Sequence, residues 1–116
     1  MAITAFVEQS QFSPRRMAET LLTTQDEIAR TAGLGRDAIA RKDRLASPKS
    51  QSRLREMAEI LNRLTPRLGS EMVAYAWYRS EPLPGFGGLT AARLVQDGKA
   101  EAVMEYIDAV DAGGFA

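Results

Sequence analysis

A stretch rich in proline and glycine, Trp77–Thr90, separates two segments of helical pattern and limits the folds open to this chain. Pro84 cannot lie in a helix interior, and a proline favours extended backbone at the residue before it. The glycines allow positive φ angles or close backbone approach. Leu83 and Phe86 are apolar, so we expect an ordered elbow that packs on its own core or on a partner.

Hydrophobic periodicity elsewhere predicts helices and no strand. The strongest pattern covers Gln51–Leu64, with apolar residues three or four positions apart. Ile60 falls outside this stripe and is a candidate dimer contact. The predicted buried stripe is Leu54, Met57, Ala58, Leu61 and Leu64. The other predicted helices are Pro14–Leu22, Thr24–Gly33, Arg36–Leu45, Glu71–Arg79, Ala91–Gln96 and Ala100–Ala112. The predicted fold is therefore all-α.

Serine and threonine residues mark where these helices begin, because their side chains accept hydrogen bonds from the free N–H groups of a first turn. In Glu71–Arg79 we expect Val73 and Ala76 to face the core together with Trp77. Trp77 is thus interpreted as a core aromatic, with an interface anchor as the alternative. The expected N-caps are Ser13, Thr24, Ser47, Ser70 and Thr90. The expected stripe of the last helix is Ala100, Val103, Met104, Ile107 and Val110.

Residues 24–45 have the spacing of a helix-turn-helix. Thr24 and Glu27 form a capping box, Gly33 ends the first helix, and Ile39 anchors the second. Lys42 occupies a position where a buried apolar residue is usual, so a helical hairpin that does not bind DNA stays open. On the DNA interpretation, arginines read bases and lysines contact phosphates. The predicted DNA-binding residues are Arg36, Asp37, Arg41, Lys42, Arg44 and Lys49.

The charge is distributed unevenly along the chain. Residues 30–67 carry ten Lys or Arg against four Asp or Glu, whereas residues 68–116 carry three against seven. A basic segment suits a polyanion, and an acidic one is repelled by it. We therefore expect two functions in separate parts of the chain. The expected parts are a flexible arm at 1–12, a helix-turn-helix region with a long linking helix at 13–68, and a small helical C-terminal domain at 69–116.

Several classes of function are disfavoured by composition. The chain has no cysteine and no histidine, which removes thiol nucleophiles, disulfides, imidazole bases and the usual zinc ligands. The carboxylates are scattered at helix-surface spacing. We expect neither an enzyme nor a resident cofactor or metal. The sequence also lacks a transmembrane run and a convincing signal peptide, so we expect no membrane association and a cytoplasmic location.

The elbow and the segments after it resemble a known family. The segment PLPGFGGLTAARL, a short helix, a stop at Gly98 and a last helix ending in Gly-Gly-Phe-Ala are similar to the toxin-binding domain of Xre/MbcA/ParS-type antitoxins. The resemblance covers roughly residues 20 to 116. It implies that the partner is a RES-domain toxin, which consumes NAD or modifies proteins with ADP-ribose, and that this chain binds no NAD itself.

The resemblance also implies which residues meet the toxin. Family members cover the active-site cleft of the toxin with their C-terminal segment, and the matching positions here are Arg93 and the chain end. We expect the elbow to supply affinity and the chain end to inhibit. The predicted toxin-binding residues are Leu83, Pro84, Phe86, Gly87, Gly88, Arg93, Gly113, Gly114, Phe115 and Ala116. Arg93 has a simpler interpretation as the i+4 ion-pair partner of Asp97.

Three functions remain in competition. The first is an antitoxin that also represses its own operon, as a dimer on operator DNA of two-fold symmetry. The second is a dimeric helix-turn-helix transcription regulator without a toxin partner. The third is a structural adaptor that does not bind DNA. The resemblance favours the first, because a regulator that only dimerises has no evident need for the elbow or for the Gly-Gly-Phe-Ala end.

Overall fold

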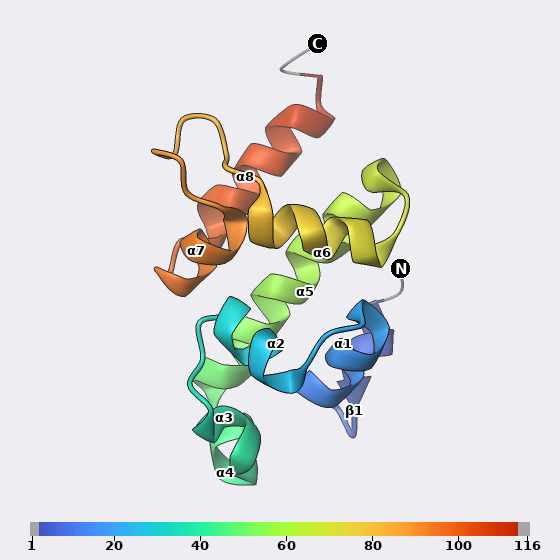
Figure 1. Cartoon of the computed structure of the whole chain (residues 1–116), viewed down its shortest axis with the longest axis vertical. Helices are drawn as coiled ribbons and strands as arrows, with labels where there is room; N and C mark the ends of the chain where they lie inside the picture. The colour runs from blue at the N-terminus through green and yellow to red at the C-terminus, as the bar shows by residue number, and fades with distance from the viewer. Residues whose placement is uncertain (1–2, 114–116) are drawn as a thin grey trace.

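The computed structural model describes residues 3–113, which form a helical body of 45 × 26 × 21 Å around one long helix, α5 (Pro48–Leu68) (Figure 1). Other helices pack on several sides of α5, so its buried surface is wider than one stripe. The predicted stripe is confirmed, but Ile60 is fully buried and the expectation that it lies exposed is wrong. The fully or almost fully buried residues of α5 include Leu54, Met57, Ala58, Ile60, Leu61 and Leu64.

The N-terminal segment packs on this body. It comprises a 3-10 helix, η1 (Ile3–Phe6), and a two-stranded antiparallel hairpin, β1 (Val7–Glu8) and β2 (Gln11–Phe12). Phe6 is fully buried. The side-chain amide of Gln51 accepts from the N–H of Phe12 at 2.8 Å and donates to its carbonyl at 3.2 Å. Residues 3–12 therefore belong to the folded body. For these residues the prediction of a flexible arm is wrong, and so is the prediction that the chain contains no strand.

Helices α1 (Pro14–Leu21) and α2 (Gln25–Thr31) begin as the sequence predicts. Ser13 Oγ accepts from the N–H of Arg16 at 3.2 Å, and Thr24 Oγ1 accepts from that of Glu27 at 3.1 Å. The other three predicted caps make the same bond. Side-chain capping thus sets the starts of five helices.

The predicted second helix of the helix-turn-helix is not continuous. It is divided into two single turns, α3 (Asp37–Ala40) and α4 (Lys42–Leu45), because Arg41 has extended backbone with φ −123° and ψ 122°. Ile39, expected to anchor the helix, is half-buried. A ten-residue helix is marginal in water unless packing supports it. With Ala38 as its buried apolar residue, this segment has little such support.

The C-terminal half contains α6 (Glu71–Ser80), α7 (Ala91–Gln96) and α8 (Ala100–Asp111). In α8 the predicted face is turned inward, with Ala100, Val103 and Ile107 buried and Met104 and Val110 half-buried. In α6 the predicted face is wrong for Val73, which is 49% exposed, and for Ala76, which is exposed; Ala74, Tyr75 and Tyr78 are buried in their place. Trp77 is half-buried and packs against the core, as predicted. Both tyrosines can face inward because their hydroxyl groups have a hydrogen-bond partner in the core.

That partner lies in the other half of the chain. The hydroxyl of Tyr78 donates to the carbonyl of Thr31 at 2.6 Å, and the hydroxyls of Tyr75 and Thr31 are 3.3 Å apart. Gln96 Nε2 donates to the carbonyl of Arg30 at 3.0 Å. A Cβ added at Gly33 would lie 2.9 Å from Cα of Gln96, so that turn requires glycine. One hydrophobic cluster spans both halves and crosses the expected boundary at 68/69.

Candidate partner-binding surface

The elbow between α6 and α7 is a small closed hairpin. Pro82 and Thr90 form an isolated antiparallel bridge at its base, and the N–H of Leu83 donates to the carbonyl of Leu89 at 2.9 Å. In Figure 1 it is the loop that projects above α7, far along the long axis from α3 and α4. The elbow thus has backbone pairing of its own.

Two successive β-turns build the tip of this hairpin. Leu83–Phe86 closes with a bond from the last N–H to the first carbonyl at 3.2 Å, and Gly85 has the positive φ, 85°, that a type II turn needs at this position. Phe86–Leu89 closes at 3.1 Å, with φ of 65° at Gly87 and 84° at Gly88, as in a type I′ turn. Proline and glycine therefore fix the shape before any partner binds.

The elbow presents some of the predicted contact residues and hides one. Leu83 is 1% exposed and fills the core of this chain, so its predicted role as a contact for a partner is wrong. Pro84, Gly87 and Gly88 are exposed. Phe86 is half-buried, with its ring edge-to-face on Tyr106 of α8 at 6.2 Å between centroids. The tip is thereby attached to α8 while one side of Phe86 stays accessible.

The other predicted toxin contacts lie near α7 and the chain end. Arg93 is exposed, and its Nε lies 3.3 Å from Oδ1 of Asp97, which is the simpler interpretation that the sequence left open. Gly113 follows α8 with φ 83°. Gly114, Phe115 and Ala116 lie outside the described residues, so their predicted role stays a prediction.

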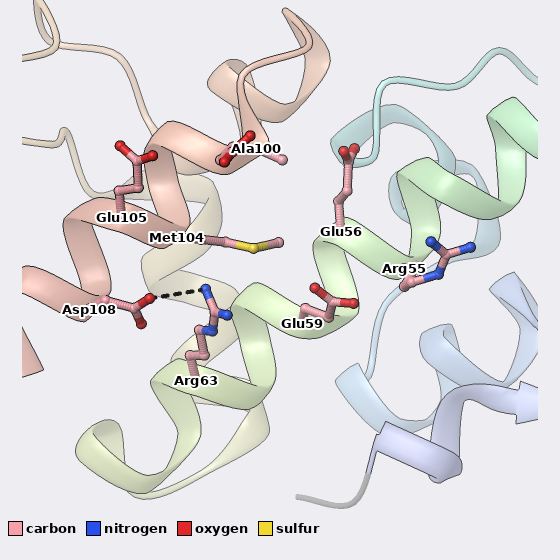
Figure 2. Close-up of a pocket in the computed structure, with 9 residues that line it drawn as sticks. Arg55, Glu56, Glu59, Arg63, Ala100, Met104, Glu105 and Asp108 are labelled. Carbon is pink, nitrogen blue, oxygen red and sulfur yellow. Dashed lines mark ion pairs between the residues drawn. The ribbon is translucent and has the colours of Figure 1, made fainter.

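A groove of about 380 Å³ lies between α5 and α8 and was not predicted from the sequence (Figure 2). Ala100 and the half-buried Met104 provide its apolar part. Arg63 and Asp108 form an ion pair across it at 3.6 Å between Nη1 and Oδ2. The remaining lining residues are all charged: Arg55, Glu56, Glu59, Glu101 and Glu105. Two segments far apart in sequence are needed to form this groove, so periodicity within one helix does not reveal it.

The predicted DNA-binding residues are exposed, but many of their charges are paired locally. Arg36 Nε is 4.0 Å from Asp26, Arg41 Nη2 is 3.1 Å from Asp43, and Arg44 Nε is 3.9 Å from Asp37. Lys42 and Lys49 are also exposed, and neither has an ion-pair partner within residues 3–113. The three arginines and two lysines lie at the end of the molecule that contains α3 and α4.

The part of the chain that the structure describes contains no group of side chains that could hold a metal ion. Burial raises the pKa of the Tyr78 hydroxyl well above its ordinary value, but that group bonds inside the core. Among these residues, no helix is long and apolar enough to cross a membrane.

Comparison with known proteins gives one result. Residues 61–113 match the family model for the antitoxin Xre/MbcA/ParS C-terminal toxin-binding domain. The matched segment begins inside α5 and ends after α8, so it contains the whole elbow and the α8 wall of the groove. Neither a curated protein nor a solved structure matches this chain.

Proposed function

We propose that the partner of this chain is a RES-domain toxin whose active site it covers, because residues 61–113 match the model of the Xre/MbcA/ParS C-terminal toxin-binding domain. The pair would be a type II toxin–antitoxin system, in which a protein antitoxin neutralises a protein toxin by direct binding. The chain itself contributes no catalysis and holds no cofactor in this proposal.

The shape of the elbow is the observation that carries the proposal. Its two turns and its bridge are formed within the free chain, so docking orders little additional backbone. Its exposed tip, Pro84–Gly88, combines a proline and three glycines with the accessible side of Phe86. Glycines without a Cβ let a partner's backbone approach closely. A rigid tip with one aromatic anchor is typical of an interface hot spot.

The chain end has the inhibitory role in this proposal. The apolar stripe of α8 needs no residue beyond Val110, and Gly113 ends the helix in the left-handed region. In this proposal residues 113–116 enter the toxin's active-site cleft. The elbow would determine affinity and the chain end would determine inhibition.

Expression together with the toxin encoded by the neighbouring reading frame tests this division. We expect the wild-type chain to rescue growth. Deletion of Gly113–Ala116 should leave a complex that co-purifies with an active toxin, whereas Phe86→Ala should weaken the complex itself. Leu22→Ala is the matched apolar truncation, because Leu22 is 74% exposed and remote from α8 in sequence. Full neutralisation by the truncated chain, with equal amounts of both proteins, would show that the chain end is not inhibitory.

Repression of the operon is the second part of the proposal, and the exposed cations of residues 36–49 favour it. Because the helix is broken at Arg41 and three arginines are paired locally, we expect phosphate contacts to outweigh base reading. A dimer of the chain would bind two half-sites. Replacing Lys42 and Lys49 with alanine should weaken binding to the promoter fragment and flatten its salt dependence. The proposal fails if gel-shift affinity is unchanged in this double variant and in Arg41→Ala/Arg44→Ala.

A further inference from the structure

We propose that the groove between α5 and α8 is a second contact site for the toxin, and that it receives a segment with basic side chains next to an apolar one. This inference rests on the proposed function, because it assigns the groove to the same partner. It adds a surface formed by residues of α5 and α8 that the sequence did not predict to bind the toxin, and it states the chemistry that the partner must present there.

The charge of the groove is the first argument. Its lining contains five carboxylates and two guanidinium groups. Asp108 is paired with Arg63, and Glu56 is paired with Arg53 at 3.3 Å. Glu59, Glu101 and Glu105 have no ion-pair partner among residues 3–113. Arg55 also lines the groove without an ion-pair partner among residues 3–113, so the unpaired side chains leave a net excess of negative charge for a partner.

The position of these charges is the second argument. On the C-terminal side of the groove, Asp108 and Asp111 of α8 are paired with Arg63 and Arg67 of α5, so those carboxylates already have partners within the chain. On the N-terminal side this pairing ends. Glu101 and Glu105 are four residues apart on one face, an arrangement of like charges that destabilises a helix. The helix dipole favours Glu101 in the first turn, but it gives no comparable benefit to Glu105.

The apolar part of the groove is the third argument. Met104 lies between Glu101 and Glu105 on α8, and in Figure 2 its side chain extends from α8 toward α5. A thioether adapts to irregular partners, and the methylene chain of an arginine or lysine can pack on it while the charged end reaches a carboxylate. The groove thus fits a cationic side chain along its whole length, not merely at its charged head.

The surroundings of the groove distinguish a toxin from other occupants. Nucleic acid would be repelled by the negative charges. The carboxylates are spread along the groove, and among the residues that the structure describes no metal-holding group is found. A second copy of this chain could offer its basic residues 41–49. We assign the groove to the toxin because residues 61–113, the toxin-binding domain, include Arg63 and the whole α8 wall.

Charge neutralisation in the groove tests this assignment. The probe is the purified toxin encoded beside this chain, and the dissociation constant is measured by titration calorimetry. Glu101→Gln/Glu105→Gln should weaken binding about tenfold at low ionic strength, and less at high salt where such pairs are screened. The control Glu19→Gln/Asp26→Asn removes the same charge from exposed positions on α1 and α2, and should leave the affinity within about twofold of the wild-type value.

The outcomes separate the groove from the proposed function. If the wild-type chain does not bind the toxin, the proposed function fails. If Phe86→Ala weakens binding while the groove and control variants both bind like the wild type, the elbow is confirmed and the groove assignment is wrong. The remaining outcome is a dimer of this chain, which sedimentation of the free chain would detect. A wild-type dimer that dissociates in the groove variant, with toxin affinity unchanged, would assign the groove to a second copy and overturn our proposal.

Discussion

The elbow, residues 82–90, and the segment 36–46 are both short and have backbone bonds of their own, yet they differ in how much apolar side chain anchors them to the core. The elbow is closed by its own backbone bonds and by Leu83 in the core. The segment 36–46 also has backbone bonds within its two single turns, but Ala38 is its buried apolar anchor, and its charged side chains pair with one another on the surface. Burial of a large apolar side chain anchors a segment firmly, whereas a buried alanine and exposed ion pairs restrict it only weakly.

This difference bears on how each region can recognise a partner. A surface fixed in advance loses little conformational entropy on binding and suits a specific protein contact. A segment with little apolar burial can rearrange, and its arginines must leave their present carboxylates before they contact a phosphate. In our account the elbow is therefore the specific element, and residues 36–46 adapt to what they bind.

The largest expected effect comes from removing the core anchor of the elbow. Leu83→Ala should lower the free energy of unfolding by about 2–5 kcal/mol, as truncation of buried leucines does. Ile39→Ala, the corresponding truncation in the half-buried segment, should change it by no more than about 1 kcal/mol. Urea denaturation measures both values. Equal losses for the two variants would mean that the regions are held equally firmly.

The next effect concerns the bond that joins the two halves. Tyr78→Phe leaves the buried carbonyl of Thr31 without that donor and should cost about 1–2 kcal/mol. Burial raises the pKa of Tyr78 in the folded chain, so the unfolded chain loses this proton first, near pH 10. Stability should therefore fall as pH rises above about 10. Unfolding measured against pH should show a shallower decline in Tyr78→Phe, and parallel declines would contradict this role.

A smaller effect is expected from the turn glycines. Gly87 has a φ of 65° and open space around its missing Cβ, so Gly87→Ala should cost about 1 kcal/mol from backbone strain alone. Gly35→Ala is the control in the other region, because its φ is not positive and its Cβ would meet a flexible carboxylate oxygen of Asp37. Thermal melting should register a loss in the first variant only. An unchanged melt for Gly87→Ala would show that the turn relaxes at no cost.

Local signals in the sequence predicted much of the fold. The stripe of α5, the inward face of α8 and the caps at Ser13 and Thr90 all depend on neighbours within about two helical turns, so periodicity and capping rules reach them. The presence of the elbow followed from its prolines and glycines in the same way.

The features that the sequence could not predict depend on distant partners. Tyr75 and Tyr78 face the core because Thr31 supplies their bonds, and nothing near α6 reveals that. The break at Arg41 reflects missing packing, which a helical pattern does not report. The groove requires α5 and α8 to meet, and the burial of Leu83 shows that an apolar elbow residue can serve its own core in place of a partner.

Amide hydrogen exchange, compared between the free chain and its complex with the toxin encoded beside it, tests the central claim most directly. Our account predicts that the complex slows exchange at the elbow tip, residues 84–88, and at the first turns of α8, while residues 36–46 exchange as in the free chain. Slower exchange at 36–46 with an unchanged elbow would contradict it, because the toxin would then be bound by the adaptable region and not by the preformed one.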